Sequence, residues 1–392
     1  MASYAGPIVD VDIHHRPRNN AELIPYLDQP WRDFAWRWAG YVDQRNGFNS
    51  FPLYPPRKSA ASPISTHNFG RISSAFPDDG SIAGSSYEIL KEQILDKYDY
   101  YRAIICHDVG EYGVHTNSQF SDELCRAANR WNVETWLTID DDRLHSEIVV
   151  PAAQPADGAA EIRRYADHPK MSGALLAGNA SGKPLGDTRF DPIFKAAVES
   201  GLPLCVHPWP GDLPTNQNIH VGGNVASIEG RTLWGQQVLH YISSFIVNGT
   251  FEKFPDLTVV IKEYGVVWLP FLIWKLDERY KELRLESPWV KRWPSEYIHD
   301  HIRISTQPIE EASHDVRATQ EFMSLVDGME DILCFSTDFP HHTIDYPDYV
   351  AKLLPRPWAR KVLCDNACEA YGFPVPDDTG PQGLRTEAAV HG

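Results

Sequence analysis

The sequence predicts an α/β protein in which eight parallel strands close into a (β/α)8 TIM barrel. Short apolar segments rich in Val, Ile and Leu alternate with helical segments along most of the chain, an order typical of a parallel sheet. Eight such strands can be assigned, which is the number that closes this barrel. A doubly wound open sheet is the rival fold, but the Gly-rich dinucleotide fingerprint does not follow the first strand.

The predicted elements alternate regularly from residue 87 onward. One helix has clear boundaries, because Asp191 and Pro192 provide an N-cap and a first-turn proline and Gly201 provides a stop. The predicted strands are 8–15, 101–106, 133–139, 173–176, 202–206, 257–261, 301–305 and 332–335. The predicted helices are 87–98, 118–131, 155–166, 191–201, 233–247, 265–285, 316–326, 347–354 and 357–371.

Two long segments interrupt the alternation. Residues 16–86 follow the first strand and residues 208–230 follow the fifth, and both contain Trp among Pro or Gly residues. Segments of this length without regular structure are typical of lids and binding loops, so we interpret both as lid insertions. We interpret residues 1–373 as one barrel domain and the tail 374–392, rich in Pro and Gly, as loosely ordered.

Charge and composition exclude several classes of partner. Among 392 residues, 36 basic and 53 acidic side chains give a formal net charge of −17, which disfavours nucleic acid and anionic membranes as partners. The sequence contains neither a secretion signal at its start nor an apolar run of the ~20 residues that a membrane span needs. The six cysteines form no CxxC pair, which suits a reducing compartment. We expect a cytoplasmic protein that binds a small molecule.

The first strand carries an unusual set of polar residues. Alternate side chains of a strand face the same way, so Asp10, Asp12 and His14 share one face while aliphatic residues line the other. Carboxylate oxygen and imidazole nitrogen are ligands that borderline divalent metals accept together. This strand is therefore predicted to deliver ligands to a cation.

Two further strands end in residues of the same kind. His207 ends the fifth strand and Asp338 ends the eighth, at the carboxyl edge where barrel enzymes place their catalytic residues. We therefore predict a mononuclear metal site made of Asp12, His14, His207 and Asp338. Further polar residues at predicted strand ends are His107, Asp140 and Glu263.

These motifs resemble those of a known family. In order and spacing they are similar to the amidohydrolase-related metal-dependent hydrolases, in the branch of aminocarboxymuconate-semialdehyde decarboxylase. The likeness covers roughly residues 8–372, and the segment 249–257 and the residues 365–367 also resemble that family. The motifs that carry it are Asp10-Val-Asp12-Ile-His14, Pro203-Leu-Cys-Val-His207 and Thr337-Asp338-Phe-Pro340-His341.

The resemblance implies a (β/α)8 barrel that binds one divalent metal ion, with Zn2+ as our first choice and Mn2+ as the alternative. Two positions depart from the family pattern. Asp12 stands where many members have a histidine, and Glu263 stands where the well-known decarboxylases have a catalytic histidine. A carboxylate still ligates such metals. Because Glu263 replaces that histidine, the proton-transfer step of those decarboxylases does not carry over directly to this protein.

The predicted chemistry follows from the placement of charge. A divalent metal activates water and polarises a substrate oxygen, so Asp338 is predicted to act as general base and Glu263 to exchange a proton opposite it. Three carboxylates around the ion disfavour a substrate that places its own carboxylate on the metal. We therefore prefer hydrolysis of a small cyclic, aromatic or unsaturated substrate. The alternatives are non-oxidative decarboxylation of an aromatic or related carboxylic acid, and a ligand-binding barrel without catalysis.

Several residues have two possible roles. Asp10 is either a ligand or, as we prefer, a group that orients the ligands, and His341 is predicted to fix the loop after Asp338. Glu263 is either catalytic or part of a structural ion pair. The apolar helix 265–285 either packs on the barrel or forms a homodimer interface. Residues on the long loops and the following helix that we assign to substrate binding are Trp209, His220, Arg231 and Trp234.

Overall fold

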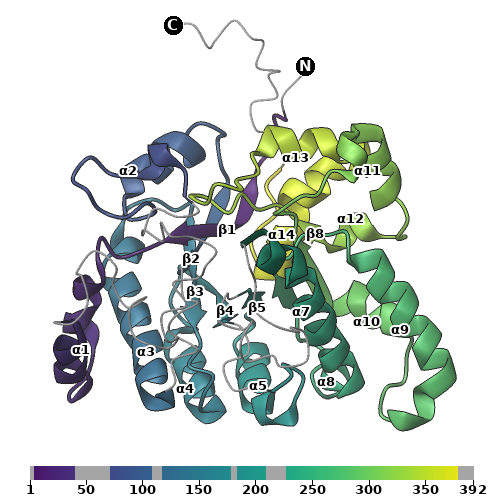
Figure 1. The fold of residues 1–392 in the computed structure, drawn as a ribbon, viewed down its shortest axis with the longest axis horizontal. Coiled ribbons are helices and arrows are strands. Elements are labelled where there is room, and N and C mark those ends of the chain that lie inside the picture. The colour runs from purple at the N-terminus through teal and green to yellow at the C-terminus, as the bar shows by residue number, and fades with distance from the viewer. Residues whose placement is uncertain (1–3, 40–70, 108–116, 178–182, 209–226, 378–392) are drawn as a thin grey trace, which may run out of the picture.

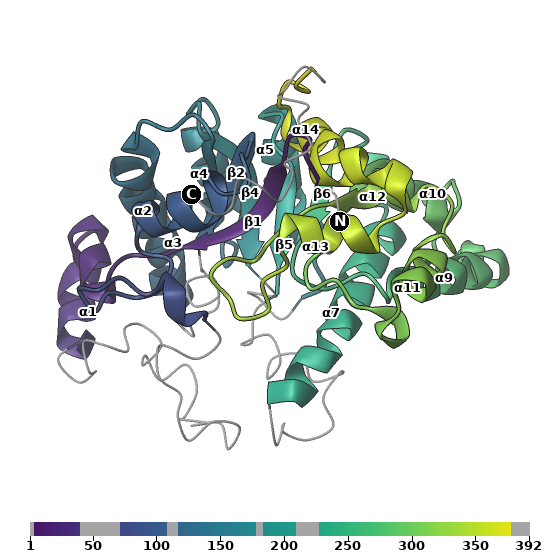
Figure 2. The same ribbon diagram turned by 90° about the horizontal axis from the view of Figure 1, so that it is seen from above.

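The structure is a computed structural model, and it describes residues 4–39, 71–107, 117–177, 183–208 and 227–377. Eight strands within these residues pair in chain order, and every neighbouring pair is parallel. Helices surround the strands, which occupy the middle of the molecule in two perpendicular views (Figures 1 and 2).

The bounds of the elements are as follows. The strands are β1 Val9–His15, β2 Arg102–His107, β3 Leu144–Val149, β4 Met171–Ala177, β5 Leu204–His207, β6 Val259–Ile261, β7 Ile302–Ser305 and β8 Leu333–Cys334. The α-helices in the described residues are α1 Trp31–Ala39, α2 Tyr87–Leu90, α3 Ser118–Glu134, α4 Pro155–Tyr165, α5 Asp191–Glu199, α7 Ser227–Val247, α8 Thr250–Lys253, α9 Leu269–Leu283, α10 Pro294–His301, α11 Val316–Met323, α12 Met329–Ile332, α13 Pro347–Leu353 and α14 Asn366–Tyr371.

Backbone hydrogen bonds join the last strand to the first. The Val11 N–H donates to the Phe335 carbonyl at 3.0 Å, and the Asp338 N–H donates to the Asp12 carbonyl at 2.9 Å. An isolated parallel bridge also pairs Ile13 with Phe339. The sheet thus closes on itself, and the predicted (β/α)8 TIM barrel is confirmed. Closure of the barrel also explains why residues 12 and 338, far apart in the chain, lie together where β8 meets β1.

Local sequence features explain where several helices begin. Proline occupies the first turn of α4, α5, α9, α10 and α13, where its missing N–H costs nothing. The Asn117 side chain caps α3 by accepting from the Phe120 N–H at 3.1 Å. The predicted helix at 191–201 is present as α5, but Asp191 is its first residue and not its N-cap. Its carboxylate pairs instead with Lys253 Nζ at 2.7 Å.

The third strand was predicted in the wrong place. Residues 133–139 have the composition of a strand, yet α3 continues to Glu134 and a 3-10 turn covers Trp136–Thr138. Trp136 is buried as part of this turn, and its apolar side chain packs against the barrel. The true strand, β3, was missed because it contains Ser146 and Glu147. Asp140 consequently lies before β3, exposed and away from the site.

The long segment after β1 has more regular structure than predicted. Residues 20–26 form a 3-10 helix and α1 follows, within a region interpreted as a lid without regular elements. The central part of that region, residues 40–70, lies outside the described residues, as do residues 209–226 of the second lid and most of the tail 374–392. Among the helices that the structure describes, none combines the length and apolar character needed to cross a membrane.

Candidate metal centre

Five ionisable side chains converge where β1, β5, β6 and β8 end. His14 Nε2 lies 3.0 Å from Asp338 Oδ1, across the seam between β1 and β8. His207 Nε2 lies 3.6 Å from Asp12 Oδ2 and 3.2 Å from Glu263 Oε2. The ring centroids of His14 and His207 are 5.0 Å apart. The structure therefore brings together the four predicted ligands, with Glu263 beside them.

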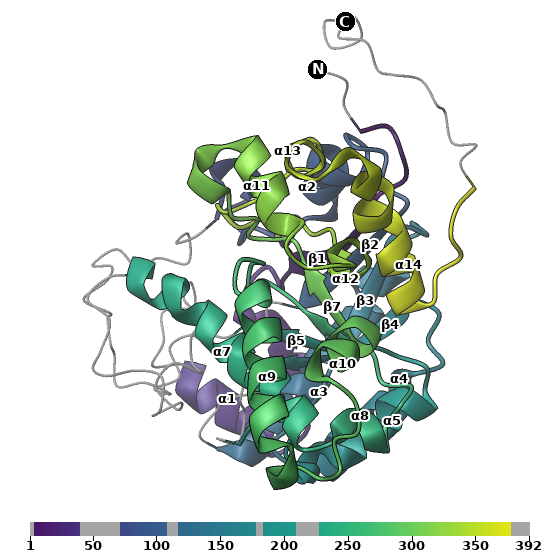
Figure 3. The ribbon, with the colours of Figure 1, turned by 90° about the vertical axis from the view of Figure 1, so that its right-hand side faces the viewer.

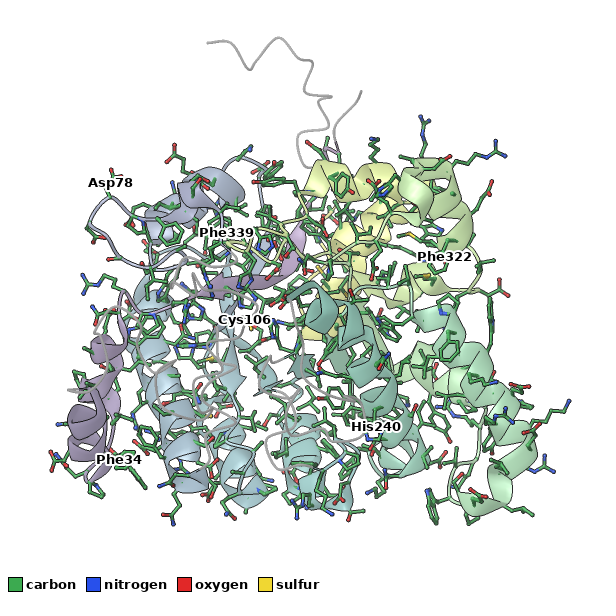
Figure 4. All side chains as sticks on the ribbon, in the orientation of Figure 1. Phe34, Asp78, Cys106, His240, Phe322 and Phe339 are labelled. Carbon is green, nitrogen blue, oxygen red and sulfur yellow. The ribbon has the colours of Figure 1, made fainter. Side chains whose placement is uncertain are left out.

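His14 is the common member of this cluster. In the described residues it belongs to three groups whose potential ligand atoms all lie within 4.8 Å of one another. One group adds His341, whose Nδ1 is 2.5 Å from Asp338 Oδ1. Another adds Cys106 of β2, which sequence reasoning missed and which Figure 4 labels beside β1 in the middle of the molecule. Burial raises the pKa of the Cys106 thiol well above its ordinary value, so this side chain is a neutral thiol.

A backbone contact fixes the orientation of His207. Its Nδ1 lies 2.8 Å from the Pro208 carbonyl oxygen, which accepts hydrogen bonds only, so Nδ1 carries a proton. Nε2 is then the nitrogen that faces Asp12 and Glu263. Metal-ligating histidines are commonly held in this way, because the hydrogen bond at one nitrogen selects the tautomer that offers the other.

Two neutral side chains donate hydrogen bonds to the Oδ2 oxygen of Asp338. Gln307 Nε2 donates to Asp338 Oδ2 at 2.9 Å, and the Thr343 hydroxyl donates to the same oxygen at 3.2 Å. The other oxygen, Oδ1, faces His14 and His341. Gln307 and Thr343 were missed, since neither lies at a strand end in a recognisable motif. They leave Oδ1 as the oxygen available to a cation.

Two site residues have strained backbones. The φ angle is 56° at Glu263 and 62° at Asp338, in the left-handed region that residues other than glycine seldom adopt. Strain of this kind is held by the surrounding structure and concentrates at functional sites. It turns the chain sharply just after β6 and β8, where the two carboxylates enter the cluster.

Asp10 lies behind the cluster and connects β1 to the segment after β8. Its Oδ1 accepts from the backbone N–H groups of Asp12 at 3.0 Å and Thr337 at 3.1 Å. Its Oδ2 accepts from the Thr337 hydroxyl at 2.6 Å and the Tyr100 hydroxyl at 3.1 Å. Burial raises the pKa of Asp10 to about 7, although the hydrogen bonds from Thr337 and from the Asp12 backbone oppose the shift. Each carboxylate oxygen of Asp10 thus accepts two hydrogen bonds, and these bonds hold β1 against the segment after β8.

A lysine that sequence analysis did not single out also borders the cluster. Lys262 precedes Glu263 and is fully buried, with Nζ 2.7 Å from Glu147 Oε1 and 3.8 Å from Asp12 Oδ1. Burial alone would lower the pKa of Lys262, but the two carboxylates raise it above its ordinary value. The side chain is therefore a permanent positive charge inside the barrel.

The electrostatics of the cluster favour bound positive charge. Burial lowers the pKa of His207, but the carboxylates of Asp12 and Glu263 outweigh this and raise it to about 9. The pKa of His14 is raised as well, by Asp12 and Asp338 against the effect of burial. Burial would raise the pKa of Asp338, yet His341 and His14 hold it well below its usual range. Protons on the imidazoles of His14 and His207 thus balance the negative charge of the carboxylates, as a bound metal ion would.

The donor set fits one divalent metal ion. Both carboxylate oxygens of Asp12 are buried and accept no hydrogen bond from any described residue. A buried ionised carboxylate that accepts no hydrogen bond is costly unless a cation binds it. Two imidazole nitrogens and the Oδ1 atom of Asp338 complete a mixed nitrogen and oxygen set that zinc and manganese both accept.

The described residues place one further predicted side chain, His107, and leave four others undescribed. His107 is buried at the end of β2, where its ring centroid lies 5.2 Å from His15 and 5.3 Å from Trp131. Trp209 and His220 lie outside the described residues. For Arg231 and Trp234, the structure describes the backbone in α7 and not the side chains.

The chain is similar to one known protein family over most of its length. The sequence profile of the family described as Amidohydrolase matches residues 11–373. A curated relative, Decarboxylase orsB of Emericella nidulans, is 28% identical over 164 residues, which are 39% of this chain and 47% of the relative. The chain thus aligns with about half the length of that relative.

Two solved structures share the fold. One is 5-carboxyvanillate decarboxylase LigW from Sphingomonas paucimobilis, with a TM-score of 0.65 and 17% identity over 94% of this chain and 100% of that one. The other is the 5-carboxyvanillate decarboxylase from Novosphingobium aromaticivorans, complexed with manganese and 4-hydroxy-3-methoxy-5-nitrobenzoic acid. Its TM-score is 0.65 and its identity 16%, over 94% of this chain and 97% of that one. At such identities the likeness concerns the fold. Because the profile match covers nearly the whole barrel, the chain belongs to the amidohydrolase family of enzymes.

Proposed function

We propose that this protein is a metal-dependent, non-oxidative decarboxylase of a hydroxylated aromatic carboxylic acid. The observation that carries the proposal is the similarity to a curated decarboxylase. The manganese and the hydroxylated nitrobenzoic acid in the Novosphingobium relative support the same class of cofactor and ligand. The comparisons thus favour the alternative reading of the sequence over the hydrolysis that we preferred. Membership of an enzyme family also disfavours a barrel without catalysis.

Lys262 weakens the electrostatic argument for hydrolysis. The three carboxylates of Asp12, Glu263 and Asp338 are not the whole charge of the site, because Lys262 compensates part of it. The positive Nζ of Lys262 lies 3.8 Å from Asp12 and offsets part of this negative potential. A substrate carboxylate therefore meets less repulsion than the ligand count suggests, and decarboxylation becomes compatible with the site.

The roles of the residues follow from their positions. Asp12, His14, His207 and Asp338 would hold one divalent ion, Zn2+ or Mn2+, whose Lewis acidity would withdraw electron density from a substrate oxygen. Glu263, beside His207, would take up a proton from water and donate it to the ring carbon that bears the carboxylate. The bond to the carboxylate carbon then breaks, its electron pair returns to the ring, and CO2 leaves. Glu263 recovers its proton from water.

Substrate binding is assigned to the loops at the same end of the barrel. We propose that 16–86 and 208–230 cover the site as lids, because both segments follow strands at the carboxyl edge of the sheet. Their aromatic residues would contact the ring of the substrate, and Arg231 would pair with its carboxylate. These assignments to Trp209, His220, Arg231 and Trp234 stay predictions.

Release of CO2 tests the proposal directly. Purified protein loaded with Mn2+ or Zn2+ is incubated with a panel of hydroxylated benzoic acids, and CO2 and the decarboxylated phenol are measured together. We expect both products in equal amounts from at least one acid, and neither from the metal-free protein. Cleavage of lactones or cyclic amides in a parallel panel, without CO2 from any acid, would support hydrolysis instead.

We also propose that two chains pair through the outer face of α9. Its inner face is buried through Leu269, Leu272 and Ile273, so packing on the barrel does not need the rest of the helix. Phe271 and Trp274 lie on the outside, 58% and 55% exposed, and Figures 1 and 3 place α9 at the outer surface of the molecule. Large exposed apolar residues close together are typical of interfaces.

Light scattering tests this pairing. We expect a molar mass near twice the 44.3 kDa of one chain. Phe271→Glu combined with Trp274→Glu should yield a folded monomer, because the charges would be desolvated at the interface. A wild-type mass of one chain at every accessible concentration would contradict the proposal.

A further inference from the structure

A buried ion pair lies directly behind the candidate metal ligands. Lys262 Nζ, just after β6, is 2.7 Å from Glu147 Oε1 on β3, and neither side chain has any exposed surface. The Tyr371 hydroxyl donates to the same Glu147 oxygen at 3.0 Å. Such pairs seldom stabilise a fold, because apolar residues of similar size are often as good or better. Stability therefore does not explain why the interior of this barrel contains one.

The orientation of the pair relates it to the site. Its positive end faces the cluster, since Lys262 Nζ is 3.8 Å from Asp12 Oδ1. This distance is too long for a hydrogen bond and short enough for a strong charge interaction. Although the pair is neutral as a whole, the cation is the member in contact with Asp12. The pair thus adds positive potential where Asp12 meets a metal ion.

We propose that Lys262 and Glu147 form a charge-tuning pair that lowers the affinity of the Asp12 site for its divalent ion. Glu147 fixes Lys262 in place, and Lys262 in turn offsets part of the charge of Asp12. The ion is then held by a less negative set of ligands, and a substrate carboxylate is repelled less. This inference rests on the proposed metal-dependent function and assigns a role to two residues outside the ligand set.

Two variants separate charge tuning from a structural role. In Lys262→Met/Glu147→Gln the charges are removed and the volumes are kept, and the introduced amide oxygen can still accept from the Tyr371 hydroxyl. We expect Mn2+ to bind this protein about tenfold more tightly, because a nearby positive charge is lost. Glu147→Gln alone leaves Lys262 without its counter-charge, so Mn2+ should bind about tenfold more weakly. A purely structural role would weaken binding in both variants.

The measurement is a competition titration of Mn2+ against a chelating dye, with thermal unfolding as a check on folding. Arg130→Met/Glu123→Gln is the matched control, because it removes an ion pair on the outer helix α3 and should leave the Mn2+ affinity unchanged. If Glu147→Gln does not fold, the double variant decides alone, since it contains no unpaired charge.

The outcomes distinguish this inference from the function on which it rests. Tighter Mn2+ binding by the double variant supports charge tuning. Weaker or unchanged binding by the double variant overturns charge tuning while leaving the metal site intact. A wild-type protein that binds neither Mn2+ nor Zn2+ overturns the proposed function itself.

Discussion

Asp338→Asn is expected to abolish metal retention and activity together. The substitution keeps the shape of the side chain but removes the charge that faces His14 and His341. Groups that merely orient a metal ligand contribute about 10- to 100-fold to metal affinity, so loss of a ligand charge should exceed about 100-fold. Activity should fall by about 1000-fold or more, since the Lewis acidity is lost together with the metal ion. Elemental analysis of the purified variant and turnover assays measure the two effects.

His207→Ala should behave in the same way, because it removes the nitrogen that faces Asp12. Stripping the wild-type protein with a chelator should give the same loss of activity, and adding Mn2+ or Zn2+ should restore activity to the wild type only. Asp122→Asn is the control, since Asp122 is also a buried aspartate but belongs to the outer helix α3. Wild-type metal content in Asp338→Asn and His207→Ala would refute the assigned ligand set.

Glu263→Gln is expected to retain the metal and lose catalysis. Glutamine preserves the size of the side chain and its contact with His207, but it cannot donate and recover a proton at the substrate. Positioned acids and bases contribute about 100- to 10,000-fold, and the turnover number should fall by a factor in this range. Metal content and thermal unfolding should stay close to those of the wild type.

The comparison with Glu161→Gln makes this result specific. Glu161 is a buried glutamate on α4 that accepts a hydrogen bond from Asn129, so the same substitution there tests burial without chemistry. Its activity should match that of the wild type. If Glu263→Gln keeps full activity, Glu263 is a structural ion-pair partner of His207 and another group handles the proton.

The sequence by itself determined the fold class and the predicted ligands. The convergence of Asp12, His14, His207 and Asp338 was predictable because each lies at or near the end of a short apolar strand, and parallel strands of a barrel end at one edge. That inference needs only local periodicity and residue type. The exception was β3, which was predicted at the wrong residues. Ser146 and Glu147 interrupt the apolar pattern of the true strand, whereas Trp136 and its neighbours have the composition of a strand but form a turn.

The tertiary structure alone decided how the ligands are held and what balances their charge. Gln307 and Thr343 orient Asp338, and Lys262 meets Glu147 and Asp12, from elements far apart in the chain. No local sequence pattern predicts such contacts, because polar residues of these types occur throughout the sequence. These contacts form only when barrel closure brings β1, β3, β6 and β8 around one buried space. An unpaired charge is costly there, so charged side chains pair with one another.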